Sequence, residues 1–306
     1  MPTLQVPKDT PAIVGRTLTR DDVAIVQAWQ RGNWDAVLAM ANGALKANPG
    51  DVFARMFHGT SSFNLGHYDD AIADESIVLT TEPAAVMALQ VRGASEYAVD
   101  RYQEAIADET RALALHETAF SHNYRGAARF MIGQYADAVS DLNDALTIDP
   151  RNTWAISIRG AAKAFADDPR GALRDLDDAL QASRNDAYTR TMRGYARWLV
   201  DDYRGAIADE TVALAQRPDV MAFGVRSLAE TASHDFPAAL RDAGAAVAAG
   251  GKDAFTYEAL GDALIGNRMY GEAVKAYDAA LKVNPDPDPS LRAKRAWAAA
   301  HSGARS

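Results

Sequence analysis

The chain has 306 residues, of which 24% are charged and 48% hydrophobic, as in an ordinary folded protein. Its formal net charge of −9 disfavours non-specific binding to nucleic acid, which needs a basic stripe, so no nucleic-acid partner is expected. The absence of Cys excludes disulfides, thiolate catalysis and cysteine metal sites.

Residues 1–17 differ from everything that follows them. They carry Pro2, Pro7 and Pro11, and they lack the apolar segment of a secretory signal. No run in the chain approaches the ~18 apolar residues that a membrane span needs. The sequence therefore predicts a mobile N-terminal arm at residues 1–17, no membrane insertion and a cytoplasmic location.

From residue 18 to residue 285 one pattern returns eight times with a period close to 34 residues. A small residue is followed by an aromatic nine positions later, then by two Ala, as in Gly126, Tyr135, Ala138 and Ala145. A unit this short cannot bury its own apolar face, so its copies must stack into a solenoid. Numbered from 1 to 34, the copies begin at Leu18, Val52, Val86, Ala119, Thr153, Ala187, Val220 and Ala254.

Each copy is predicted to form two helices of about 14 residues. Turn-forming residues such as Gly66 and Gly133 stand between positions 13 and 17 and separate the two apolar patterns. Residues 286–306 are predicted to form a linker and a capping helix, with Ser290 as its N-cap and Trp297 covering the last repeat. The alternative for this helix is a basic docking tail.

These residues resemble the tetratricopeptide repeat family over about residues 18–285. The resemblance implies an all-α fold: a right-handed superhelical solenoid of about eight helix pairs, A and B, with the A helices along its concave wall. It also implies binding of peptides or protein segments without catalysis. The chain is thus predicted to be no enzyme and to use no cofactor. The pair His116 and His122 gives a weak metal signal, which we interpret as surface polar residues.

Two columns of the repeat predict a ladder of partly buried ion pairs between helices A and B. Position 7 is Arg and position 23 is Asp in repeats three to seven, and repeat two has His58 with Asp74. The alternative is a row of charged ligand sites. Glu at position 24 is expected to join the network in Glu75, Glu109 and Glu210. The predicted pairs are Arg92–Asp108, Arg125–Asp141, Arg159–Asp175, Arg193–Asp209 and Arg226–Asp242.

In the family, positions 2, 5, 9, 12 and 13 of helix A face the groove. Carried over, these columns hold aromatic rings beside small or polar residues, but no Lys or Arg, so acidic chaperone tails are not expected to bind. The alternative for any one ring is packing on the next A helix. The predicted groove residues are Phe53, Met56, Phe63, Met87, Tyr97, Phe120, Asn123, Phe130, Trp154, Tyr188, Tyr195 and Trp198.

The sequence thus favours an interaction scaffold that binds a protein or peptide segment with apolar side chains in an aromatic-lined groove. Self-association is also possible for such a solenoid. One alternative is a ligand- or peptide-responsive sensor. Another is an assembly factor of a larger complex whose groove is occupied by its own N-terminal arm.

Overall fold

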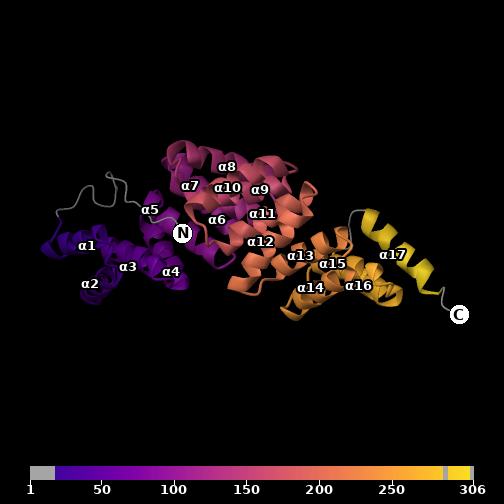
Figure 1. The fold of residues 1–306 in the computed structure, drawn as a ribbon. Coiled ribbons are helices and arrows are strands. Elements are labelled where there is room, and N and C mark those ends of the chain that lie inside the picture. Colours follow the sequence, from indigo (N-terminus) through magenta and orange to yellow (C-terminus); the bar gives the residue numbers. More distant parts are fainter. Residues whose placement is uncertain (1–17, 285–288, 304–306) are drawn as a thin grey trace. The chain divides into compact units, whose positions relative to one another are not determined.

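The protein is described by a computed structural model over residues 18–284 and 289–303, and within these ranges it is helical without β-strands (Figure 1). This confirms the predicted all-α fold; the predicted arm and linker lie outside the described residues. The described helices are α1 (Arg20–Gln30), α2 (Trp34–Ala47), α3 (Val52–Asn64), α4 (Tyr68–Thr81), α5 (Val86–Ala98), α6 (Tyr102–Leu115), α7 (Ala119–Met131), α8 (Tyr135–Ile148), α9 (Thr153–Phe165), α10 (Pro169–Ala182), α11 (Ala187–Leu199), α12 (Tyr203–Gln216), α13 (Val220–Ala232), α14 (Phe236–Ala248), α15 (Ala254–Gly266), α16 (Tyr270–Val283) and α17 (Pro289–Ser302).

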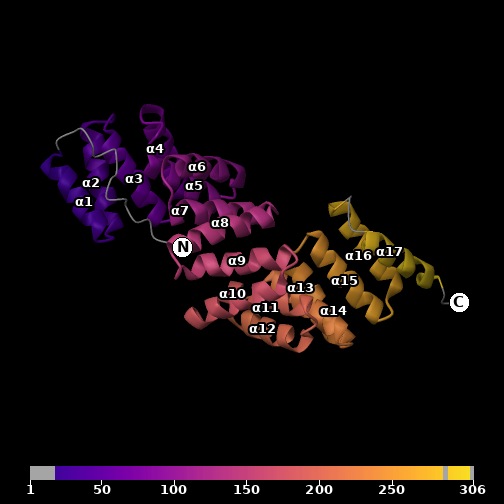
Figure 2. The ribbon, with the colours of Figure 1, turned by 90° about the horizontal axis from the view of Figure 1, so that it is seen from above.

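The chain divides into two compact units, Met1–Arg159 and Gly160–Ser306, and each is described by itself. In both, an A helix packs on the B helix that follows it, as α7 does on α8 and α11 on α12 (Figures 1 and 2). Successive A helices also touch, α5 with α7 in the first unit and α13 with α15 in the second. This arrangement is a helical-repeat solenoid, and it places the A helices side by side along one wall.

Every turn from an A helix to its B helix has the same backbone geometry. The residue at position 15 of the repeat adopts a positive φ in all eight copies, as in Gly66 (φ 82°) and Gly133 (φ 80°). Asp takes this position three times because it tolerates the left-handed region better than most residues do. The predicted turns between the two helices are therefore confirmed, and each contains one residue in the left-handed region.

The small residue at position 8 makes room for the side chain at position 24 of the same repeat. A Cβ on Gly194 would lie 2.1 Å from Oε1 of Glu210, and one on Gly261 would lie 2.3 Å from the Tyr277 ring. Repeat one reverses the sizes, with Ile25 facing a small residue at position 24, and both side chains are fully buried. The close approach of helix A to helix B thus depends on the summed volume of the side chains at positions 8 and 24.

The arginine at position 7 bridges three helices. Arg125 on α7 donates from Nε to Asp141 Oδ2 (3.0 Å) and from Nη2 to Asp141 Oδ1 (2.7 Å) on α8. Its Nη1 donates to Thr110 Oγ1 on α6, the B helix of the preceding repeat (3.3 Å). The same three-helix contact recurs at Arg92, Arg193 and Arg226.

The remaining ladder positions have different surroundings. His58 Nδ1 forms a short contact with the Asp74 carboxylate, which also accepts from Arg55 (3.0 Å). Arg159 donates to Asn143 (2.9 Å) in the first unit. Its predicted partner, Asp175, belongs to the second unit and accepts from Lys163 there, so the Arg159–Asp175 pair stays a prediction.

Helix α17 packs on the last repeat through buried Leu291 and Ala298. Trp297 does not cover the core as predicted, because 47% of its surface is exposed. Lys294 binds carboxylates on α15, and Arg295 donates to Asp278 on α16 (2.9 Å). These basic residues hold the helix on the solenoid, which disfavours a free docking tail. Among the described helices, none combines the length and apolar content needed to cross a bilayer.

The ladder predicts a large effect for one substitution. Asp141→Ala removes the acceptor of Arg125 and Arg129 and leaves their charges partly buried, so we expect the free energy of unfolding to fall by about 3–5 kcal/mol. Asp144→Ala, on the same helix with a side chain 55% exposed, serves as control and should change it by less than about 0.5 kcal/mol. Urea denaturation measures both. Equal unfolding midpoints for the two variants would show that the ladder does not stabilise the fold.

Candidate functional site

In the first unit, most of the predicted groove side chains fill the interior of the wall. Five of them are at most 5% exposed, which leaves little surface for a partner: Phe53, Met56, Phe63, Met87 and Asn123. Four are partly exposed: Tyr97, Phe120, Phe130 and Trp154. The five buried side chains therefore fit the alternative in which a ring packs inside the wall. The four partly exposed rings form the accessible part of this wall.

Rings at position 12 pack against the aromatic at position 17 of the same repeat. The centroids of Phe130 and Tyr135 are 5.8 Å apart, and those of Tyr97 and Tyr102 are also 5.8 Å apart. Repeats one and two have the same pairing of rings. Each pair links the end of an A helix to the start of its B helix. The rings at position 12 therefore stabilise the turn more than they line the groove.

Tyr124, at position 6 on α7, is the centre of an aromatic cluster that sequence reasoning missed. It is fully buried and its ring contacts those of Phe63, Tyr97, Phe120 and Trp154, with centroid distances of 4.6–6.4 Å. Its hydroxyl has no hydrogen-bond partner among the described residues, and burial raises the pKa of this phenol. The sequence contained one signal for this cluster: position 6 of the repeat is a Tyr here and an apolar residue in the other copies.

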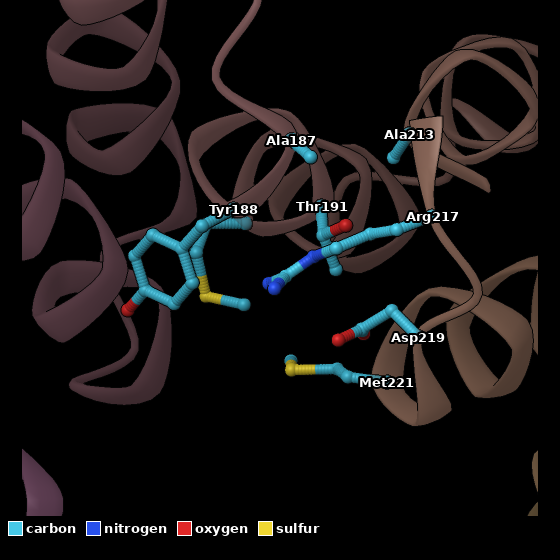
Figure 3. A pocket seen from close by; sticks show the side chains of 8 residues that line it. Ala187, Tyr188, Thr191, Ala213, Arg217, Asp219 and Met221 are labelled. Atoms are coloured by element: carbon cyan, nitrogen blue, oxygen red, sulfur yellow. The ribbon is translucent and has the colours of Figure 1, made fainter. Parts of the chain in front are cut away.

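The second unit has open space on the same face of its A helices. A pocket of about 140 Å³ lies between α11 and α13, lined by Tyr188 and Thr191 of α11 and by Met221 of α13. Figure 3 shows the Arg217 side chain reaching from the loop before α13 into this space, with Asp219 beside it. Arg217 lies outside the helix A columns, which is why sequence reasoning did not select it.

A larger pocket of about 420 Å³ adjoins the first and shares Asp219 and Met221 with it. Its aromatic lining comes from Phe165, Tyr195 and Phe255. Phe165 and Tyr195 stack with centroids 4.9 Å apart and ring planes 28° apart. Trp198 extends this stack on α11, with its centroid 5.9 Å from that of Tyr195. We call the lining of the two pockets the second-unit wall.

Two carboxylates of the second-unit wall also begin helices. Asp219 Oδ1 accepts from the backbone N–H of Ala222 (3.0 Å) and caps α13. Asp253 caps α15, where Oδ1 accepts from the N–H of Thr256 (2.8 Å) and Oδ2 from its hydroxyl (2.9 Å). The caps fix both carboxylates at the rim of the larger pocket, because their positions follow from the helix starts.

Three buried carboxyls lie between helices A and B of their own repeats. Burial raises the pKa of Glu210 to about 9, against the opposing effect of the Thr191 hydroxyl, and burial also raises the pKa values of Glu75 and Glu109 well above the usual range. Within the described residues these carboxyls form no ion pair with the ladder arginines, so the expected extension of the network is wrong. They are buried groups packed against position 8 of their repeats.

One cluster has the composition of a metal site. His122, Asp141 and Asp144 place a ligand atom each within 4.8 Å of one another. However, Asp141 already accepts from two guanidinium groups, those of Arg125 and Arg129, which oppose a bound cation. Hydrogen bonding to Asp141 raises the pKa of His122. The prediction of a surface histidine is wrong here, because His122 is buried beside the ladder.

A third pocket, of about 700 Å³, lies where α17 meets the last repeat. Its lining includes Phe236, Tyr270 and Trp297. Its charged groups are largely occupied, since Lys294 donates to Asp262 (2.7 Å) across it. This pocket offers aromatic surface, and Arg268 is also among its lining residues.

Comparisons with known proteins agree with this fold. A family model described as tetratricopeptide repeat matches residues 256–287. A chain in the crystal structure of the APC/C hetero-tetramer Cut9–Hcn1 superposes with a TM-score of 0.67 at 14% identity, over 87% of this chain and 52% of that one. A tetratricopeptide repeat protein from Parabacteroides merdae gives a TM-score of 0.61 at 16% identity, over 81% of this chain and 98% of that one.

The fold is that of a helical-repeat solenoid, and its last repeat matches the tetratricopeptide repeat model. The chain spans about half the length of the Cut9–Hcn1 chain that it matches. A search of curated protein sequences found no significant match.

The buried Glu210 predicts a specific pH dependence. The folded carboxyl keeps its proton up to about pH 9, whereas the unfolded one releases it near its ordinary pKa, so raising the pH between these values destabilises the fold. The slope from one such group is at most about 1.4 kcal/mol per pH unit. Glu210→Gln cannot ionise and should remove this contribution.

Chemical denaturation at several pH values between these two pKa values measures how the free energy of unfolding changes with pH. Glu272→Gln, at an exposed position on α16, is the control and should retain the wild-type slope. A wild-type slope in Glu210→Gln as well would contradict a neutral buried carboxyl.

Proposed function

We propose that this protein is a non-catalytic interaction scaffold that holds a peptide or protein segment on the second-unit wall. The supporting observation is the pair of adjoining pockets, of about 140 and 420 Å³, with partly exposed rings from successive A helices. Pockets lined by aromatic rings with a few fixed polar groups suit the anchoring side chains of a bound segment.

The spacing of the pockets favours an extended segment over a compact ligand. The lining is contributed in turn by α11, α13 and α15, so the accessible surface runs across the A helices instead of closing around one point. A segment laid across them would place successive side chains in successive pockets. Apolar side chains would meet Tyr188 and Met221, and the polar backbone would meet Thr191, Arg217 and Asp219 at the edges.

The first unit contributes differently to this proposal. Five of its predicted groove residues are buried, and four of its predicted groove rings gather around Tyr124. We therefore propose that the first unit supports the fold and offers a flatter surface for secondary contacts. Tyr97, Phe120, Phe130 and Trp154 would supply those contacts.

The wall is tested by placing a charge in it. Tyr188→Glu puts a carboxylate in the smaller pocket, where burying it beneath an apolar side chain is unfavourable, so peptide affinity should fall at least about tenfold. Affinity is measured by fluorescence anisotropy with peptides selected on the wild-type protein from a random dodecapeptide phage library. Val212→Glu, at an exposed position on the B helix α12, is the matched control.

Circular dichroism should show unchanged helix content and melting for both variants. Undiminished binding by Tyr188→Glu, or equal losses in the two variants, would exclude the wall as the binding surface.

A further inference from the structure

The lining of the larger pocket of the second-unit wall carries negative charge, which an apolar ligand would leave unpaired. Its lining includes two carboxylates, those of Asp219 and Asp253, and no cationic side chain. A purely apolar side chain seated there would bring no counter-charge to the half-buried Asp219 or to Asp253 at the rim. The pocket therefore favours an occupant that brings positive charge.

The hydrogen bonds of these carboxylates leave their charge in place. Both accept from a backbone N–H at a helix start, and Asp253 also accepts from the Thr256 hydroxyl. A helix N-terminus offsets only about half an elementary charge. Within the described residues neither carboxylate is in an ion pair, and Arg217 lies in the neighbouring smaller pocket. The rim of the larger pocket is thus net negative.

The rest of the lining suits a cation on an apolar stem. Aromatic faces carry partial negative charge and attract ammonium and guanidinium groups. Phe165 and Tyr195 present a stacked pair, and Phe255 lies over Gly224, where a Cβ would come within 2.6 Å of its ring. Met221 adds a polarisable thioether. A methylene stem would lie against these groups while its charged end reached the carboxylates.

We propose that the pocket formed by Phe165, Tyr195, Met221 and Phe255 receives a lysine or arginine side chain of the bound segment, paired with Asp219 and Asp253. This inference rests on the proposed function and specifies its partner: a segment with one cationic anchor beside apolar residues. Acidic segments are disfavoured at this pocket, because they would face two carboxylates of the same sign.

The experiment uses the full chain and peptides selected on it from the random dodecapeptide library. The selected peptides should share a Lys or Arg. Replacing that residue by norleucine in the synthetic peptide, which keeps the stem and removes the charge, should weaken binding about tenfold. Raising the salt concentration from about 50 to about 500 mM should weaken the parent peptide and have little effect on the norleucine peptide.

The protein-side variants are Asp219→Asn and Asp253→Asn. Asn is as good an N-cap as Asp, so each variant removes charge while keeping its helix start. Each should weaken the parent peptide several-fold and leave the norleucine peptide unaffected. Asp235→Asn is the control, because Asp235 caps α14 in the same manner but lies outside the pocket lining.

The outcomes separate the two proposals. Selected peptides that bind the wild type, lose affinity in Tyr188→Glu and lack any cationic requirement would overturn the cationic anchor and leave the peptide-binding wall standing. Affinity unchanged in both Asp219→Asn and Asp253→Asn would do the same. If no peptide is selected by the wild type over Tyr188→Glu, the proposed function and the anchor both fail.

Discussion

The guanidinium at position 7 is the contact on which the alignment of this solenoid depends. Arg125 joins its own B helix through Asp141 and the preceding B helix through Thr110. Because the guanidinium is planar and its donors point in fixed directions, it can satisfy both acceptors only at one spacing of the three helices. The contact recurs, as at Arg193, and so joins successive repeats in the same way.

The two units use this scaffold in different ways because their interior volumes differ. Tyr124 at position 6 gathers four other rings, and the first unit consequently closes around an aromatic core. The equivalent residue on α13 is the smaller Val225, preceded by Gly224 at position 5. The larger pocket lies in this second unit, lined by Tyr195, Met221 and Phe255. Under the proposed function, partner binding is concentrated in the unit that has these pockets.

Sequence periodicity predicted the helices, their order and the columns that face one another, since these depend on residues a fixed distance apart. It was less successful for the wall, because whether a ring is accessible depends on what its neighbours leave uncovered. Phe63 and Trp198 stand at the same position 12, yet the first is buried and the second is partly exposed. Arg217 was not selected because it reaches the smaller pocket from a loop that no column describes.

Local rules acting within about 34 residues were therefore enough to determine an all-helical repeat, the turns between its helices and the matching of Arg with Asp in four repeats. Only the tertiary structure decided that burial raises the pKa of Glu210, that Tyr124 is the centre of an aromatic cluster and that two adjoining pockets form the second-unit wall. Periodicity records which residues share a face, whereas burial and free volume depend on the summed sizes of side chains from several helices, which packing alone sets.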